Sequence, residues 1–225
     1  MDDKIAHWRS SDNTPHLVRQ HLRDVGALSA FFASKLHAPL IGELLGLLHD
    51  LGKYSKAFQD YIRSALGMVN CDEDDYVDAN AQRGKIDHSS AGAQFIWHVL
   101  SEKGALEFRL AQILSLCIAS HHSGLIDCLN VEGDDNFTRR MNKEAQKTHL
   151  DEVGKVADPE ILKRANEILN SPELISELKC IVSRIFAKNP EQYRARRRTG
   201  QLQIGFAVRF LFRRLIDADR IDTAD

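Results

Sequence analysis

The stretch Leu47-Leu48-His49-Asp50-Leu51-Gly52-Lys53 ends an apolar run with an adjacent imidazole and carboxylate. Adjacent residues of an α-helix are about 100° apart, so both side chains reach a common centre only at a helix end that faces a cavity. Such a pair offers donors that divalent transition metals accept, and a carboxylate can bridge two ions. The alternative is an ordinary helix C-terminus, with His49 beside the last carbonyls and Gly52 as a left-handed cap. The remaining histidines decide between these interpretations.

Composition predicts a single globular domain over residues 1–225. The chain is 43% hydrophobic and carries a formal net charge of −2, so any basic surface for nucleic acid must be local. No apolar run approaches the roughly 20 residues that a membrane helix needs, which predicts no membrane partner. With no signal peptide and no CxxC pair, we expect a cytoplasmic protein with reduced thiols at Cys71, Cys117, Cys128 and Cys180.

Hydrophobic periodicity predicts an all-α domain of seven or more helices, and no segment shows convincing strand alternation. Thr14-Pro15 predicts a capped helix start that leads into the first apolar helix. Residues 40–49 are apolar nearly all round, which indicates a buried helix. Further helices are predicted from 54 to 66, from 88, and over 106–121, 160–169, 173–187 and 201–216, with polar connections at 67–86 and 125–156.

Polar side chains recur at the ends and on the buried faces of these apolar helices. So many polar side chains can be buried in one small core only if hydrogen bonds, opposite charges or a bound ion satisfy their polar atoms. A single buried histidine is usually satisfied by ordinary hydrogen bonds, but for the whole set metal binding is the simpler interpretation. Ligands of this kind without thiolate suit one or two ions of Mn, Fe, Co, Ni or Zn, with Mg a poorer fit, and a pair of ions can activate water for phosphoryl displacement. The set is His21, His49, Asp50, His88, His121, His122 and one late aspartate.

The order of these residues resembles the HD superfamily of metal-dependent phosphohydrolases. More narrowly, it resembles the HD nuclease domain of the CRISPR type I effector nuclease-helicase. The His-Asp step is common to many phosphohydrolases, whereas the His-His-Ser-Gly and Asp-His-Ser-Ser-Ala-Gly-Ala steps are more specific to the nuclease branch. The motifs are His21-Leu22-Arg23-Asp24-Val25, Leu48-His49-Asp50-Leu51-Gly52-Lys53, Asp87-His88-Ser89, Ala119-Ser120-His121-His122-Ser123-Gly124 and Asp217-Ala218-Asp219-Arg220-Ile221-Asp222.

The resemblance implies a helical bundle whose metal ligands project from helix ends and faces into one cleft. It implies Asp50 and Lys53 as catalytic residues, with Asp50 bridging two ions and Lys53 approaching the scissile phosphate. Asp217 is a nearby rival for Asp219, but Asp219 fits the family pattern and continues the apolar face of the last helix. The implied ligands are His21, His49, Asp50 and Asp219 for one ion and His88, His121 and His122 for the other.

The activity implied by the resemblance is cleavage of single-stranded DNA in CRISPR type I interference, an antiviral defence. The implied nuclease cuts internally and then processively with its helicase. The chain has no GxxxxGK[ST] phosphate loop, so the helicase portion is absent from it and ATP dependence is not expected. We expect a helicase domain in cis or in trans, and a CRISPR surveillance complex, as partners.

A local basic cluster offers a candidate DNA contact near the last helix. Its arginines would steer a phosphate backbone toward the site, and Tyr193 would stack a base, although an exposed linker with a solvated helix face explains the cluster equally well. The cluster consists of Arg194, Arg196, Arg197 and Arg198, followed by Arg209, Arg213 and Arg214.

Two other functions use the same residues differently. An HD phosphohydrolase of a nucleotide or other small phosphate ester would keep the metal core, but would need a closed pocket instead of an open groove with basic walls. A catalytically silent scaffold that binds a surveillance complex would have no physical reason to keep five inward histidines. The sequence assigns no role to His7, His16, His37, His98 and His149.

Overall fold

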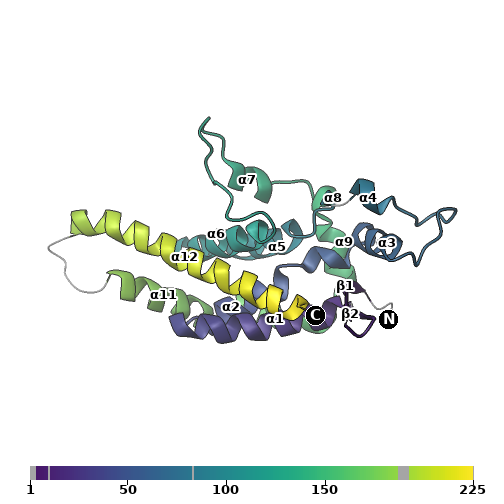
Figure 1. The fold of residues 1–225 in the computed structure, drawn as a ribbon. Helices are drawn as coiled ribbons and strands as arrows, with labels where there is room; N and C mark the ends of the chain where they lie inside the picture. The colour runs from purple at the N-terminus through teal and green to yellow at the C-terminus, as the bar shows by residue number, and fades with distance from the viewer. Residues whose placement is uncertain (1–3, 10, 83, 187–192, 225) are drawn as a thin grey trace.

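The structure, a computed structural model, describes residues 4–9, 11–82, 84–186 and 193–224, and of residues 185, 186 and 193–200 it describes the backbone alone. In this part of the chain helices account for nearly all regular structure, and Figure 1 shows them layered along one long axis. The predicted all-α class is confirmed, with one small two-stranded sheet added to it. No helix of the described part is long and apolar enough to cross a membrane.

The chain opens with a hairpin that the sequence analysis did not predict. Strand β1 (Ile5–Arg9) pairs antiparallel with β2 (Thr14–Leu17). The expected helix start at Thr14 is therefore wrong: the Asp12 carboxylate accepts hydrogen bonds from the Thr14 amide and hydroxyl and closes a turn instead of a helix cap. Pro15 lies in a two-stranded sheet, where every strand is an edge and a missing N–H is tolerated.

Two closely packed helices position the first part of the site. Helices α1 (Val18–Ala33) and α2 (Pro39–Leu48) approach so closely that a Cβ on Gly46 would lie 2.5 Å from the Gly26 nitrogen. Only glycine fits at this crossing, because any side chain would force the two helices apart. The crossing brings His21 of α1 beside the residues that follow α2.

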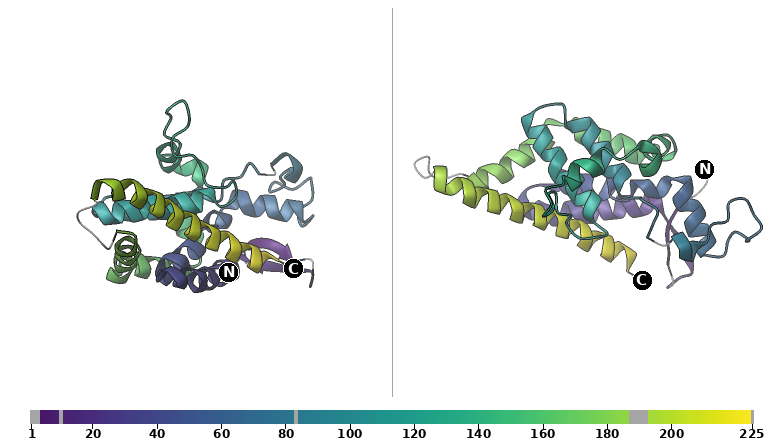
Figure 2. Two further views of the ribbon diagram at one scale, coloured as in Figure 1. Left: turned by 60° about the vertical axis from the view of Figure 1, so that its left-hand side comes forward. Right: turned by 90° about the horizontal axis from the view of Figure 1, so that it is seen from above.

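A second helix pair and the last helix complete the surroundings of the site. Helices α5 (Ser90–Leu100) and α6 (Ala105–Ser120) pack together, and a Cβ on Gly92 would lie 1.8 Å from the Leu48 carbonyl oxygen at the end of α2. Helix α12 (Tyr193–Thr223) is long and spans much of the molecule in both views of Figure 2, and its last turn contacts the hairpin, where Asp222 lies beside His16. Its Leu215 and Ala218 are fully buried against the core.

The two predicted polar connections contain short helices. A buried glutamine, Gln94 of α5, orders the second connection: its amide nitrogen donates to the carbonyls of Met141 and Lys143, and its amide oxygen accepts from the Thr148 hydroxyl. The remaining elements are η1 (Ser34–Leu36), η2 (Leu51–Tyr54), α3 (Lys56–Ala65), α4 (Ala79–Gln82), α7 (Asn136–Met141), α8 (Ala145–Thr148), α9 (Leu150–Val156), α10 (Pro159–Leu169) and α11 (Pro172–Phe186).

Candidate metal centre

The end of α2 explains how adjacent residues face one centre. His49 keeps helical torsion angles, and its Nδ1–H donates to the Gly46 carbonyl at 2.8 Å. Asp50 leaves the helix at φ −112° and ψ 25°, which turns its side chain toward the imidazole before it. Gly52 is not a left-handed cap, since its φ is not positive; instead its N–H donates to the His88 carbonyl at 3.1 Å. The backbone thus changes direction at Asp50, between the two groups of ligands described below.

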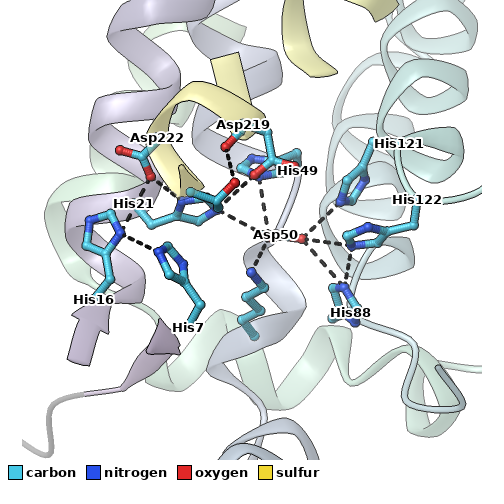
Figure 3. Close-up of polar contacts among 12 residues, drawn as sticks. His7, His16, His21, His49, Asp50, His88, His121, His122, Asp219 and Asp222 are labelled. Atoms are coloured by element: carbon cyan, nitrogen blue, oxygen red, sulfur yellow. Dashed lines mark hydrogen bonds and ion pairs between the residues drawn. The ribbon is translucent and has the colours of Figure 1, made fainter. Parts of the chain in front are cut away.

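Asp50 lies at the middle of the cluster, with its side chain 1% exposed. Figure 3 shows its two carboxylate oxygens facing different groups of imidazoles. Lys53 Nζ lies 2.6 Å from Oδ2 and neutralises part of the charge. The Nε2 atoms of His21 and His49 lie 3.3 and 3.4 Å from Oδ2, and those of His121, His122 and His88 lie 3.0, 3.6 and 3.7 Å from Oδ1.

The donor atoms form two sets that share Asp50. Within each set the ligand atoms lie within 4.8 Å of one another, which is close enough for one ion to contact them all after small adjustments. The structure therefore brings together all seven residues that the sequence analysis selected as ligands. One set is His21, His49, Asp50 and Asp219, and the other is Asp50, His88, His121 and His122.

The geometry separates the two rival aspartates of α12. Asp219 Oδ1 lies 3.5 Å from His21 Nε2 and 3.6 Å from His49 Nε2. Asp217 is paired with Arg213 at 2.8 Å and Arg214 at 3.3 Å on its own helix. Two helical residues two positions apart point in nearly opposite directions, so only Asp219 reaches the cluster.

Most donor groups are in the protonation state that a metal ion requires. Burial opposes ionisation of both carboxylates, but cationic and hydrogen-bonding neighbours outweigh it, so the pKa of Asp50 lies well below its usual range and that of Asp219 is lowered to about 2. Burial lowers the pKa of His88 to about 4 and also lowers the pKa of His121. Burial opposes the charge on His49 as well, yet the two carboxylates raise its pKa to about 10. An ion would have to displace that proton.

The outer ring nitrogens show that the imidazoles are oriented as metal ligands usually are. In metal sites the nitrogen away from the ion donates to a carboxylate or a backbone carbonyl, which fixes the ring and presents the other nitrogen. Four imidazoles of the cluster follow this pattern. The Nδ1 atoms of His21, His49, His88 and His121 lie 2.6, 2.8, 3.0 and 2.7 Å from Asp222 Oδ2, Gly46 O, Ile86 O and Ile118 O.

Two further observations test whether these residues fit a divalent ion. His49 Nε2 is buried and makes no hydrogen bond of good geometry, although the Asp50 and Asp219 carboxylates lie 3.4 and 3.6 Å from it, and a metal ion held by the same carboxylates would satisfy it. The Nε2 atoms of His88 and His122 lie 2.5 Å apart and point at the same carboxylate oxygen. Imidazole and carboxylate donors without a thiolate suit transition-metal ions, so the residues fit such a group.

Three neighbours of the cluster were missed as site residues. Asp222 accepts the short hydrogen bond from His21, and His16 Nδ1 lies 3.6 Å from the same Asp222 oxygen. His7 Nε2 lies 3.1 Å from His16 Nδ1 because strand register places the two histidines opposite each other. A signal for Asp222 was present, since it follows Asp219 by three residues and shares its helix face. The histidine pair had none, because no hairpin was predicted.

The structure does not test the predicted DNA-binding arginines. Arg194, Arg196, Arg197 and Arg198 belong to the first turns of α12, and their side chains lie outside the described part of the chain. Steering of DNA by this cluster stays a prediction.

Comparison with known proteins adds one finding. A family model described as "Cas3, HD domain" matches residues 6–183. The matched range contains every predicted ligand except Asp219, which α12 supplies. No curated protein matches the sequence significantly.

Proposed function

The chain belongs to the Cas3 HD-domain family of CRISPR-associated, metal-dependent hydrolases, and we therefore propose that it cleaves single-stranded DNA at a pair of divalent ions. The observation that carries the proposal is the position of Asp50, whose two oxygens face two separate groups of imidazoles. A carboxylate in that position suits a bridge between two ions.

In this proposal His21, His49, Asp50 and Asp219 hold one ion, and Asp50 with His88, His121 and His122 holds the other. A pair of divalent ions supplies a water of lowered pKa and positive charge against the phosphate oxygens. The chain's own residues hold that arrangement in place. The Gly46 and Ile118 carbonyls fix the rings of His49 and His121, as the Asp222 carboxylate fixes that of His21.

Lys53 is the residue we assign to the scissile phosphate. Its ammonium group lies against Asp50 and its side chain is 10% exposed, so it is held inside the site by η2. A fixed positive charge there would attract a phosphodiester and strengthen as negative charge develops on the phosphate oxygens. Gln59 accepts the Ile5 N–H and donates to the Ile5 and Lys53 carbonyls, which anchors the Lys53 backbone to the hairpin.

The exposure of the site favours a polymer over a small ester. The His122 side chain is 49% exposed although it lies 3.6 Å from a fully buried carboxylate, so this side of the cluster opens to solvent. A nucleotide hydrolase would instead enclose its substrate with base-specific contacts, as ligand pockets generally do. We further propose that residues 1–225 form one nuclease domain that acts with a helicase and a surveillance complex, in cis or in trans.

The experiment is cleavage of circular single-stranded DNA, which has no ends for an exonuclease. Purified protein would be incubated with Mn²⁺, Co²⁺, Ni²⁺, Mg²⁺ or EDTA, together with the variants Asp50→Ala and His122→Ala. We expect cutting that depends on a transition-metal ion and is lost in Asp50→Ala. His122→Ala changes a half-exposed side chain, so its loss of activity cannot be assigned to unfolding. Undiminished cutting by Asp50→Ala, or release of phosphate from a nucleotide panel without any cutting, would reject the proposal.

A further inference from the structure

A basic pocket lies beside the metal centre, in the segment that the sequence analysis treated as a polar connection. It is an open surface pocket of about 610 Å³ between the chain after α6 and helices α7 and α8. Four cationic side chains line it, against one carboxylate, that of Asp127. We define the basic pocket by these cations, which are Arg139, Arg140, Lys143 and Lys147.

One wall of the basic pocket is fastened to the residues on either side of His88. Lys143 Nζ lies 2.5 Å from Asp87 Oδ2, and Arg140 donates to the Ser89 hydroxyl at 2.8 Å. Arg140 also donates to the Ser90 hydroxyl at 3.2 Å, at the start of α5. The pocket therefore borders the half of the metal centre that contains His88.

The opposite wall comes from the chain that follows the other two imidazoles of the same half-site. Ile126 and Asp127 line the pocket only a few residues after His121 and His122. The Ile126 N–H donates to the Ser120 hydroxyl at 3.3 Å, which ties this wall to the end of α6. Both walls are thus tied to residues next to the ligands of this half of the metal centre, which are Asp87 and Ser89 beside His88 and Ser120 before His121.

Two of the four cations are free to meet a ligand. Lys143 and Arg140 are engaged with the Asp87 carboxylate and the hydroxyls of Ser89 and Ser90. Arg139 donates to the Asn136 side-chain oxygen and, among the described residues, pairs with no carboxylate. Lys147 lies 3.0 Å from Glu144, but both side chains are about two-thirds exposed and such a pair contributes little. Arg139 and Lys147 can therefore exchange these contacts for a phosphate.

The lining indicates what kind of ligand fits. Among the residues that the structure describes, none that lines the pocket has an aromatic side chain on which a base could stack. The amide of Asn136 is engaged with Arg139 and the Asp127 carbonyl. Cations without stacking or base-reading groups contact phosphates and carry no sequence information. We propose that the basic pocket binds the phosphate backbone of the single strand that reaches the His88 and His122 side of the metal centre. This inference rests on the proposed function.

The test is binding of the full chain to fluorescein-labelled single-stranded DNA, measured by anisotropy in EDTA at several salt concentrations. The variant is the double substitution Arg139→Gln and Lys147→Gln, which leaves the anchors of Asp87 untouched. We expect its Kd to rise on the order of tenfold at 0.1 M salt. The slope of log Kd against log salt should fall by about 1.4, since each single-strand phosphate contact contributes about 0.7. Oligo-dT and a mixed sequence of equal length should bind alike.

Two control variants keep the result interpretable. The double substitution Arg139→Lys and Lys147→Arg preserves charge and should retain binding. The double substitution Lys35→Gln and Lys163→Gln removes two exposed charges that line none of the pocket, and should not reduce the slope. The inference is overturned if the neutralised pocket binds like wild type, if the surface control loses as much, if charge preservation fails to retain binding, or if wild type does not bind.

Because binding is scored without metal and cleavage is not, this test is independent of the proposed reaction. A wild-type protein that binds through the pocket but never cuts DNA would contradict the proposed function and support the pocket. If wild type cuts DNA and the neutralised variant keeps the wild-type salt slope, the proposed function is supported and the pocket is contradicted.

Discussion

Replacement of Gly92 by alanine tests how the two halves of the metal centre are held together. Gly92 lies in α5, and a Cβ there would lie 1.8 Å from the Leu48 carbonyl oxygen and 2.8 Å from its carbonyl carbon. Real Cβ atoms stay at least 3.0 Å from such atoms, so α5 and α2 would have to separate by roughly 1 Å. The backbone of a buried helix end cannot yield as a flexible side chain can.

The size of the effect follows from two opposing contributions. Forcing an extra methyl group into a well-packed core costs about 1–3 kcal/mol, and a clash with backbone places Gly92→Ala at the upper end. Alanine is more favourable than glycine in a helix by about 0.8–1 kcal/mol, which offsets part of this cost. The net loss in the free energy of unfolding is therefore about 2 kcal/mol. For a chain of this length, that loss lowers Tm by about 4–8 °C.

Thermal unfolding followed by circular dichroism in EDTA measures the effect, and α9 supplies the matched control. A Cβ on Gly154 would meet nothing within 4 Å, so Gly154→Ala should gain the propensity alone and raise Tm by about 2–4 °C. Separating α5 from α2 also moves His88 from Asp50, now 3.7 Å apart, so Gly92→Ala should bind Mn²⁺ more weakly. A Gly92→Ala protein as stable as wild type would refute the close approach of these helices.

Three further predictions concern the site and the thiols. Asp222→Asn removes the carboxylate that orients an imidazole and should weaken Mn²⁺ binding by about 10–100-fold in calorimetry; unaltered affinity would exclude that role. Asp219→Asn should weaken Mn²⁺ binding at least as much. Asp217→Asn should leave Mn²⁺ affinity unchanged, because Asp217 pairs with arginines of its own helix, and the opposite result for the two variants would exchange their assignments. At pH 8 iodoacetamide should modify exposed Cys71 but not Cys117, because burial raises the pKa of Cys117 to about 12 and keeps it a thiol; mass spectrometry of peptides checks this, and equal labelling would contradict its burial.

The sequence was sufficient where local pattern and tertiary structure agree. The all-apolar run at 40–49 became α2 (Pro39–Leu48), and the paired His-Asp and His-His steps fall at the ends of α2 and α6. Apolar helices that end in polar donors have to bring those donors to a shared place, since they cannot be buried separately. On that ground we selected six residues and one late aspartate, which the family resemblance and the helical phase identified as Asp219. The structure places all seven in two adjoining sets.

The sequence was insufficient where long-range contacts decide local structure. The hairpin depends on a turn closed by Asp12. It is stabilised by the hydrogen bond from Ile5 of β1 to Gln59, which lies 54 residues further along the chain. The ordered connection after α6 depends on Gln94 in the same way. Neither long-range contact leaves a mark in the local pattern of its segment.

The same limit applies to the basic surface. The cluster at 194–198 attracted the prediction because its arginines are nearly contiguous, whereas the cations of the basic pocket are spread along two short helices, α7 and α8, and the turn between them. They lie together only because Asp87 and the serines after it fasten that segment beside His88.

The number of ions bound per chain tests the two-ion centre most directly. Metal-free protein would be titrated with Mn²⁺ in a calorimeter, and we expect wild type to bind two ions per chain. His122→Ala should keep the ion held by His21, His49 and Asp219 and weaken the other, whereas Asp50→Ala should weaken both. One ion per wild-type chain, or two bound at full strength by Asp50→Ala, would contradict the central role of Asp50.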